Sequence, residues 1–436
     1  MAAAPSVALS DGARRAPPAG PAAFAAERPR GVYTSALAPG GAAVADWQLH
    51  VARLAGNMET LNQERPPSFA PFLQWCRQQG VAAERAVGAL AGPQVAAALD
   101  LLRREAAPGG GGGASDGGGA SGGGSTGSGA DARDAMVVVV LDKSAHSGEA
   151  AAPDAAAAPA VAAAAAPAAG AAGAAAGAPL SVSVLAAWLP ARAGGRADEA
   201  VKVVARGGPR PWAHAKHCEW VAQRRGLEAF RPADVAEVVL TDGGDGLLEG
   251  LVTNFFVVAE VAGGGRGGGS GGGSGGSGGA RHGAAGAAAS SGGESGAAEA
   301  AANEETAGPA AAAAPGLVDL SRFELQTACG PGQPVLAGVT QRRVLEAAAA
   351  LGLAARLEAP RGGGRAAWRE AFIANCIKGL QPVRSVAFWP DGDAPQWELQ
   401  LPAPDDAGSG GGGGGGAGPV TRLLRARVAA LQSWPA

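Results

Sequence analysis

Residues 245–258 read DGLLEGLVTNFFVV, and this stretch decides the fold that the sequence predicts. Its second half is a short run of large apolar residues, which is typical of a buried strand. Residues 235–241 form another such run, and a Gly-Asp turn at 243–246 separates the two. The sequence therefore predicts an antiparallel hairpin here, with residues 251–259 as its second strand.

Further periodic segments lie on both sides of this hairpin. The expected strands are residues 31–37, 135–141, 180–189, 201–205, 369–374 and 382–388. The expected helices are residues 46–61, 83–104, 217–227 and 339–351, where apolar residues recur at helical spacing. Small helical and strand elements come first and a strand-rich half follows. This order predicts a two-lobed α+β protein.

Low-complexity tracts interrupt the periodic segments. They consist almost entirely of Gly, Ala, Ser and Pro, and cover residues 106–130, 148–179, 263–315 and 404–418. Such tracts bury too little apolar surface to offset chain entropy, so we expect disordered insertions. The expected organisation is a disordered or targeting segment at 1–30, an N-terminal lobe at 31–199 and a C-terminal cofactor-binding lobe at 200–436.

Composition argues against several classes of function. A net charge of −3 over 436 residues provides no basic footprint for nucleic acid. No run of bulky apolar residues is long enough for a membrane span. The four cysteines are widely spaced, which fits a reducing compartment, cytoplasmic or plastid, rather than secretion. His214, His217 and Cys218 have no fourth ligand at a suitable spacing, so no metal site is expected.

Lysine is scarce in this chain. Lys143, Lys202, Lys216 and Lys378 are the four present, and arginine cannot replace lysine in amine chemistry because its guanidinium stays protonated. Lys216 stands in PWAHAKHCEWVAQRRGLE, residues 211–228, and Glu249 follows 33 positions later. Taken alone, these two could be a surface lysine and a turn glutamate.

Three further segments give the pair a context: WQLHVARL at 47–54, PVLAGVTQRRVLEAA at 334–348 and WREAFIANCIKGLQPV at 368–383. Together with the Lys216 and Glu249 segments, they resemble the class IV pyridoxal-phosphate-dependent aminotransferases. That family includes branched-chain and D-amino-acid aminotransferases and aminodeoxychorismate lyases. The AKH-x-x-W and LLEG-x-x-TNFF segments are most similar to a plant and green-algal branch of it.

The resemblance implies a D-amino-acid aminotransferase-like fold, a homodimer and pyridoxal 5'-phosphate as cofactor. Lys216 would hold the cofactor's aldehyde as a Schiff base and move the substrate proton, and Glu249 would keep the ring nitrogen protonated. The phosphate would be bound by the Arg53 side chain and by the backbone N–H groups of Val339 and Thr340. Cys376 takes the position of a family hydroxyl that meets the phosphate and the substrate carboxylate.

Two departures from the family leave the activity open. The family tyrosine five residues after the lysine is Val221 here, and Tyr33 is the single tyrosine of the chain. Cys376 replaces a hydroxyl with a thiol that forms weaker hydrogen bonds. The leading interpretation is a transaminase that acts on an amino acid and keto acid pair, that is, on a small-molecule substrate. A lyase that releases pyruvate from an aminodeoxychorismate-like substrate, or a non-catalytic cofactor-binding or interaction protein, are the alternatives.

Overall fold

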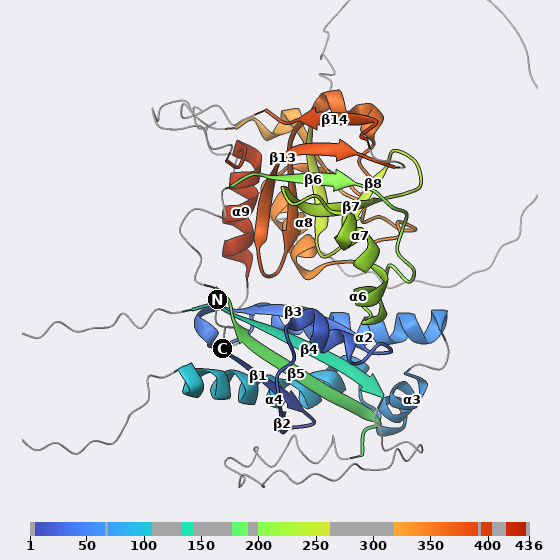
Figure 1. Ribbon diagram of the computed structural model, residues 1–436, viewed down its shortest axis with the longest axis vertical. Helices are drawn as coiled ribbons and strands as arrows, with labels where there is room; N and C mark the ends of the chain where they lie inside the picture. Colours follow the sequence, from blue (N-terminus) through green and yellow to red (C-terminus); the bar gives the residue numbers. More distant parts are fainter. Residues whose placement is uncertain are drawn as a thin grey trace, which may run out of the picture. The chain divides into compact units, whose positions relative to one another are not determined.

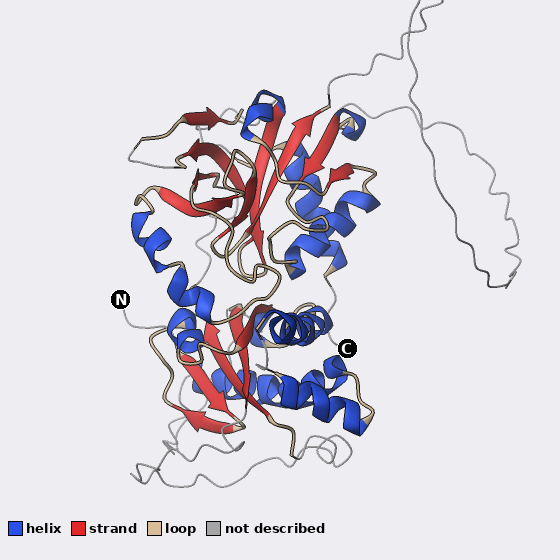
Figure 2. Ribbon diagram, turned by 90° about the vertical axis from the view of Figure 1, so that its right-hand side faces the viewer, coloured by secondary structure: helices blue, strands red, loops and turns tan. Residues whose placement is uncertain are grey.

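The computed structural model describes residues 5–65, 69–106, 133–143, 177–190, 199–261, 318–390, 394–402 and 416–432 (Figure 1). The expected insertions lie almost wholly outside these described residues. Met1–Val261 and Asp319–Ala436 belong to one compact unit. In that unit the described residues form two separate β-sheets, each covered by helices (Figure 2). The predicted two-lobed α+β organisation is therefore confirmed.

The first sheet has five antiparallel strands in the order β2-β1-β5-β4-β3. Its strands are β1 (Ser6–Ser10), β2 (Ala13–Arg15), β3 (Val32–Ala38), β4 (Ala135–Lys143) and β5 (Leu180–Trp188). The accompanying helices are α1 (Pro21–Ala26), η1 (Pro39–Gly41), α2 (Trp47–Glu64), α3 (Ala70–Gln79) and α4 (Ala83–Ala106). Alternate strand residues such as Val137 and Val139 pack with Leu54 and Leu99 of the helices in one apolar core.

The structure corrects the expectation of a disordered segment at residues 1–30, because the described residues 5–30 contain β1, β2 and α1. β1 pairs with β5 from Ser6↔Ala187 to Ser10↔Ser183, and α1 buries Phe24. Val7 and Leu9 of β1 are buried in the core of the first sheet. The strand has only five residues inside an Ala- and Pro-rich stretch, so its alternation is too short to stand out in the sequence.

The two expected strands that flank the second low-complexity tract do form a hairpin. β4 and β5 pair along their whole length, and Lys143↔Leu180 is the pair next to the connection. Residues 144–176 join these two ends and lie outside the described residues. The placement of the tract at a hairpin tip, where extra length costs little, is confirmed.

The second sheet has nine strands in the order β11-β10-β9-β12-β13-β6-β7-β8, with β14 paired to β13. A further pairing of β8 with β9 closes the run from β9 to β8 into a ring. Its strands are β6 (Val201–Ala205), β7 (Val235–Thr241), β8 (Leu247–Gly250), β9 (Asn254–Glu260), β10 (Phe323–Gln326), β11 (Ala354–Arg356), β12 (Trp368–Asn375), β13 (Gly379–Phe388) and β14 (Trp397–Gln400).

The hairpin that the sequence predicts is wrong in one respect. β7 pairs with β8, which contains Glu249, whereas β9 pairs with β10 and β12. The chain reverses a second time between Gly250 and Asn254, so that Glu249 lies opposite Asn254. The short LLEG segment is a strand of its own because it pairs with β7 on one side and β9 on the other, and all four of its residues are buried. Two tight reversals therefore replace a single one and bring Glu249 to the edge of a turn.

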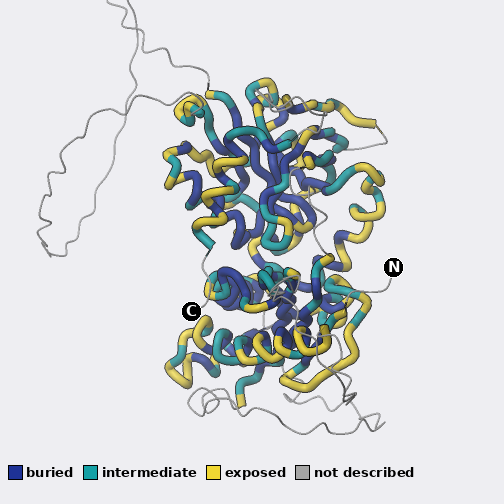
Figure 3. Tube along the Cα trace, turned by 90° about the vertical axis from the view of Figure 1, so that its left-hand side faces the viewer, coloured by how far each residue is buried: buried dark blue, intermediate teal, exposed yellow. Residues whose placement is uncertain are grey.

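The helices of the second sheet are α6 (Glu219–Gln223), α7 (Arg225–Phe230), η2 (Leu320–Arg322), α8 (Val339–Ala350), η3 (Gly362–Ala367) and α9 (Pro419–Leu431). α8 and α9 pack against each other and on β12. The expected helix at 217–227 is two short helices instead. Within the described residues, no helix has both the length and the apolar character needed to cross a bilayer. Most residues of the strands in both sheets are buried, and Figure 3 shows the buried segments in dark blue.

Candidate functional site

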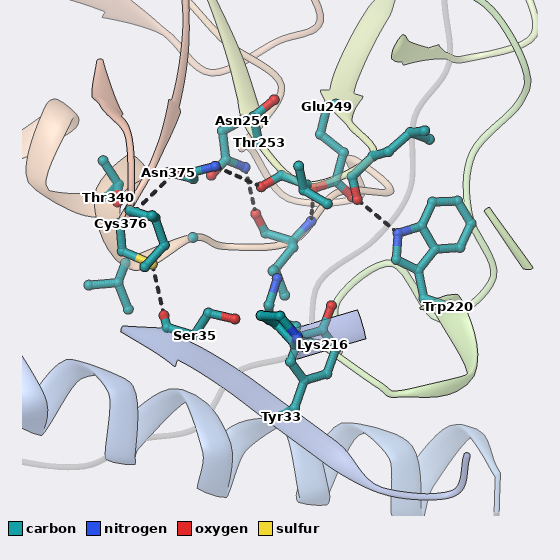
Figure 4. Close-up of a pocket in the computed structure, with 18 of the residues that line it drawn as sticks. Tyr33, Ser35, Lys216, Trp220, Glu249, Thr253, Asn254, Thr340, Asn375 and Cys376 are labelled. Carbon is teal, nitrogen blue, oxygen red and sulfur yellow. Dashed lines mark hydrogen bonds between the residues drawn. The ribbon is translucent and has the colours of Figure 1, made fainter. Parts of the chain in front are cut away.

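A cavity of about 340 Å³ gathers residues from both sheets. Its lining includes β3 and α2 of the first sheet, and the turn after β8, the start of α8 and the end of β12 from the second (Figure 4). All six residues that the sequence singled out line this cavity: Arg53, Lys216, Glu249, Val339, Thr340 and Cys376. The structure thus brings together segments that are more than 300 positions apart in the sequence. Their individual roles stay predictions.

The backbone of Lys216 is attached to β3. Its carbonyl accepts a hydrogen bond from the Tyr33 N–H at 2.9 Å, and the Cys218 N–H donates to the Gly31 carbonyl at 2.8 Å. The Lys216 Nζ atom lies 4.8 Å from the centre of the Tyr33 ring. Burial lowers the pKa of Lys216 below that of a free lysine, and the charge of Tyr33 opposes this shift. A larger share of neutral amine is therefore available than on an exposed lysine.

Tyr33 is a site residue that the sequence interpretation missed. Burial alone would raise the pKa of its phenol, but the positive charges of Lys216 and Arg224 outweigh burial, so the pKa is lowered. Tyr33 and Val221 belong to the same apolar cluster, and both line the cavity. The chain's single phenol thus lies beside Lys216, although it comes from β3 rather than from the segment that follows the lysine. Its position on a predicted strand next to Gly31 was the available signal.

Glu249 is bound by Arg210, another site residue that the sequence interpretation missed. Its Oε1 atom accepts from Nε of Arg210 at 2.7 Å, and its Oε2 atom accepts from the Leu336 N–H at 3.2 Å. Burial raises the pKa of Glu249, and the guanidinium of Arg210 opposes the rise. Arg210 also donates to the carbonyls of Ala213 and Ala215, directly before Lys216. One buried guanidinium therefore fixes both the carboxylate and the loop that carries the lysine.

The segment leading into α8 is held against the start of β9. The Asn254 side-chain N–H donates to the Leu336 carbonyl at 3.1 Å, so both backbone polar groups of Leu336 are bound by residues of the 245–258 stretch. Gly338 is required here, because a Cβ atom at this position would lie 2.2 Å from Oδ1 of Asn254. This contact explains why the LAGVT and LLEGLVTN segments meet at one place.

The first turn of α8 provides an anion-binding end. The first N–H groups of any α-helix have no acceptor within the helix, and the helix dipole adds positive potential there. The Gln341 side chain accepts from the Gly338 N–H at 3.3 Å, before the helix proper begins. Val339 and Thr340 follow, are buried and line the cavity. Their N–H groups are therefore available to an anion in the cavity.

Arg53 adds a partly buried positive charge from α2. Its Nη2 atom donates to the Thr34 hydroxyl, while its Nε atom is buried without a hydrogen-bond partner among the described residues. Burial lowers the pKa of Arg53, but a guanidinium stays protonated. An unpaired buried donor on a charged group is costly. Arg53 is therefore an incomplete site that an anionic ligand would complete.

An ion pair joins α2 to α8. Arg343 donates through Nε, at 3.1 Å, and through Nη2, at 2.5 Å, to Oδ1 of the largely buried Asp46. Asp46 directly precedes α2, and Arg343 lies one turn after Thr340. The pair thus fixes the distance between the helix that carries Arg53 and the helix whose N-terminus faces the cavity.

Cys376 follows β12, and its thiol donates to the Ser35 carbonyl of β3. Burial raises the pKa of this thiol, although Arg53 and Lys216 oppose the rise. In the view of Figure 4, Cys376 and Thr340 lie on one side of the cavity and Glu249 lies on the other. Among the described residues, no group of three or more His, Cys, Asp or Glu side chains is placed to hold a metal ion.

Comparison with known proteins supports the fold. No protein-family model matches the sequence, and no curated protein matches it. A hypothetical aminotransferase from Mycobacterium tuberculosis is similar in structure, with 14% identity over 98% of both chains and a TM-score of 0.50. A fold IV transaminase from Curtobacterium pusillum has 14% identity over 98% of this chain and 97% of its own, with a TM-score of 0.48. At 14% identity the similarity to the Mycobacterium tuberculosis protein shows the fold alone.

Proposed function

We propose that this chain is a pyridoxal-phosphate-dependent aminotransferase of class IV type, which exchanges an amino group between an amino acid and a keto acid. One observation carries the proposal. A partly buried lysine, a buried carboxylate and an incompletely bonded guanidinium beside a helix N-terminus line the same cavity. The similarity to the Mycobacterium tuberculosis fold is consistent with this proposal.

The residues present fit pyridoxal phosphate. The unpartnered Nε atom of Arg53 and the first N–H groups of α8 suit a phosphate, because both supply donors without a competing anion. The depressed pKa of Lys216 suits an amine that must react with an aldehyde. Glu249 uses two of its acceptor sites on Arg210 and Leu336, and an ionised carboxylate has further acceptor sites for a ring N–H.

When bound, the cofactor would withdraw electrons from the substrate's α-carbon. The chain's own groups would then have separate tasks. Lys216, once released from the cofactor, would take a proton from the α-carbon and return one as a general base and acid. Glu249 would stabilise a protonated ring nitrogen, while Arg210 holds the carboxylate in place. Tyr33, beside Lys216, would take part in setting the charge of that amine.

Resemblance also supports a homodimer, which light scattering would test. Binding of pyridoxal phosphate is the first test of the proposed function. Purified protein mixed with pyridoxal phosphate should develop a visible absorbance band that borohydride removes. Lys216→Ala should abolish the band, whereas Lys202→Ala, a surface lysine paired with Asp234, should retain it. Absence of the band in the unmodified protein would reject the proposal.

Loaded protein should next be given amino acids with keto-acid acceptors. Transfer of the amino group to the acceptor is the expected result. Pyruvate release from aminodeoxychorismate without an acceptor would indicate the lyase instead. A loaded protein that turns over neither kind of substrate would indicate the non-catalytic alternative.

A further inference from the structure

A third guanidinium lines the cavity besides those of Arg53 and Arg210. Arg224 stands at the junction of α6 and α7, where its backbone N–H donates to the Trp220 carbonyl at 3.0 Å. The residue is 7% exposed. Its Nε atom donates to Glu228 at 2.8 Å, but its Nη1 atom is buried and has no hydrogen-bond partner among the described residues. Arg224 is a buried cation and, like Arg53, it has a side-chain donor without a partner among the described residues.

Arg224 lies on the Lys216 side of the cavity. Its charge lowers the pKa of Tyr33, whose ring lies 4.8 Å from the Lys216 Nζ atom. Val221 precedes Arg224 by three residues and also lines the cavity, so one face of α6 points toward it. Arg53, by contrast, comes from α2, which an ion pair joins to α8. The two guanidiniums therefore serve different parts of one cavity.

The described lining around Arg224 supplies no free anion. Glu249 is the single acidic residue that lines the cavity in the described part of the chain, and it is already paired with Arg210. Glu228, the partner of the Arg224 Nε atom, has a side chain that is 44% exposed and does not line the cavity. Glu228 pairs with the Nε side of the guanidinium, so the buried Nη1 donor is left for an acceptor that enters the cavity with a ligand.

The neighbouring lining is apolar and of modest size. It consists of Pro21, Ala22 and Ala25 from α1, Met136 from β4 and Val221. The segment first expected to be disordered thus contributes a wall of the site. Such a wall accepts a small or medium apolar side chain and offers no partner for a second charged group.

Resting on the proposed function, we infer that Arg224 binds the carboxylate of the substrate, with the Tyr33 hydroxyl next to it, and so selects amino acids with apolar side chains over simple amines. A guanidinium suits this task because it presents several donors to a planar carboxylate. Val221 is shorter than the tyrosine that the family has at this position, and it leaves the approach from the cavity to Arg224 open. Arg224 is then a specificity-determining residue of the site.

The test compares amino acids with the amines that lack only their carboxylate. Alanine is paired with ethylamine, leucine with isopentylamine and phenylalanine with phenethylamine, using both enantiomers of each acid. Cofactor loading is first measured by visible absorbance. The change of that absorbance on titration with each compound then gives binding without turnover, and initial rates give KM and kcat.

Unmodified protein should prefer the acids. Arg224→Met should raise KM for the acids by about 10- to 100-fold, the range for loss of hydrogen bonds to a charged group, and leave values for the amines unchanged. Arg225→Met removes the neighbouring, solvent-exposed arginine and should change neither. If Arg224→Met does not fold, Arg224→Lys keeps the charge, and a smaller loss of the same selectivity is expected.

Three results would overturn the inference. They are equal binding of acids and amines by the unmodified protein, retained preference for acids in Arg224→Met, and weakened cofactor loading in Arg224→Met, which would make Arg224 a cofactor ligand. Failure of the unmodified protein to load the cofactor at all would instead reject the proposed function. Loading is measured separately, so the two failures are distinguishable.

Discussion

Replacing Arg210 by methionine should destabilise the protein more than loss of any surface ion pair. Arg210 and Glu249 are joined at 2.7 Å, and their side chains are 4% and 6% exposed. The substitution leaves a buried carboxylate without its counter-charge, and the Ala213 and Ala215 carbonyls lose their donors. Breaking a buried pair by removing one partner costs about 3–5 kcal/mol. The same change at Arg361, an exposed partner of Asp245, should cost less than about 1 kcal/mol.

The penalty should also depend on pH. Burial raises the folded-state pKa of Glu249 above its unfolded value, so its protonation supports folding at low pH and that support is lost as pH rises through the folded pKa. Without Arg210 the folded pKa rises further, and the destabilisation should grow from about pH 5 to pH 8.

Denaturant unfolding followed by tryptophan fluorescence measures both effects. The double variant Arg210→Met with Glu249→Gln removes the lone charge and should recover part of the loss. Together with the single variant Glu249→Gln, it gives the coupling energy of the pair. The reasoning is wrong if Arg210→Met lowers the free energy of unfolding no more than Arg361→Met does. It is also wrong if Arg210→Met lowers that free energy equally at about pH 5 and pH 8.

Three further substitutions or deletions test other parts of the structure. Tyr33→Phe removes the charge that opposes the depressed pKa of Lys216, so the pH profile of cofactor attachment should move to lower pH; an unchanged profile would contradict the contact. Deleting residues 263–315 should leave the melting temperature nearly unchanged, because β9 and β10 are antiparallel neighbours that a short connection can join; aggregation would count against this. Deleting residues 1–30 should lower solubility and the melting temperature, because β5 loses its β1 neighbour; a fully stable truncated protein would refute that role.

How far the sequence predicted the structure differs from region to region. The sequence predicted the long helices α2, α4 and α8, because apolar residues that recur at helical spacing over three or more turns fit few other structures. Short segments were not sufficient. β8 is four residues long, and its role as a separate strand depends on its neighbours β7 and β9 rather than on its own pattern.

The site shows the same limit. The resemblance to the family identified cavity-lining residues in five segments. It did not identify Arg210, Arg224 or Tyr33, because their place in the site depends on how this chain packs. Arg210 and Arg224 are ordinary arginines among 31 in the sequence, and burial alone distinguishes them. Tyr33 lies on a strand that the sequence predicted, but this strand is far from the lysine segment in the sequence, and the pairing of β3 with residues 216–218 places Tyr33 beside Lys216.

The two backbone hydrogen bonds between β3 and the lysine segment have a consequence for how the site comes into being. The Tyr33 and Cys218 amide hydrogens are both engaged across that junction. Folding therefore positions the Lys216 segment beside β3 without the help of a ligand. Slow hydrogen–deuterium exchange at these two amides in the ligand-free protein would show that this part of the site is preorganised.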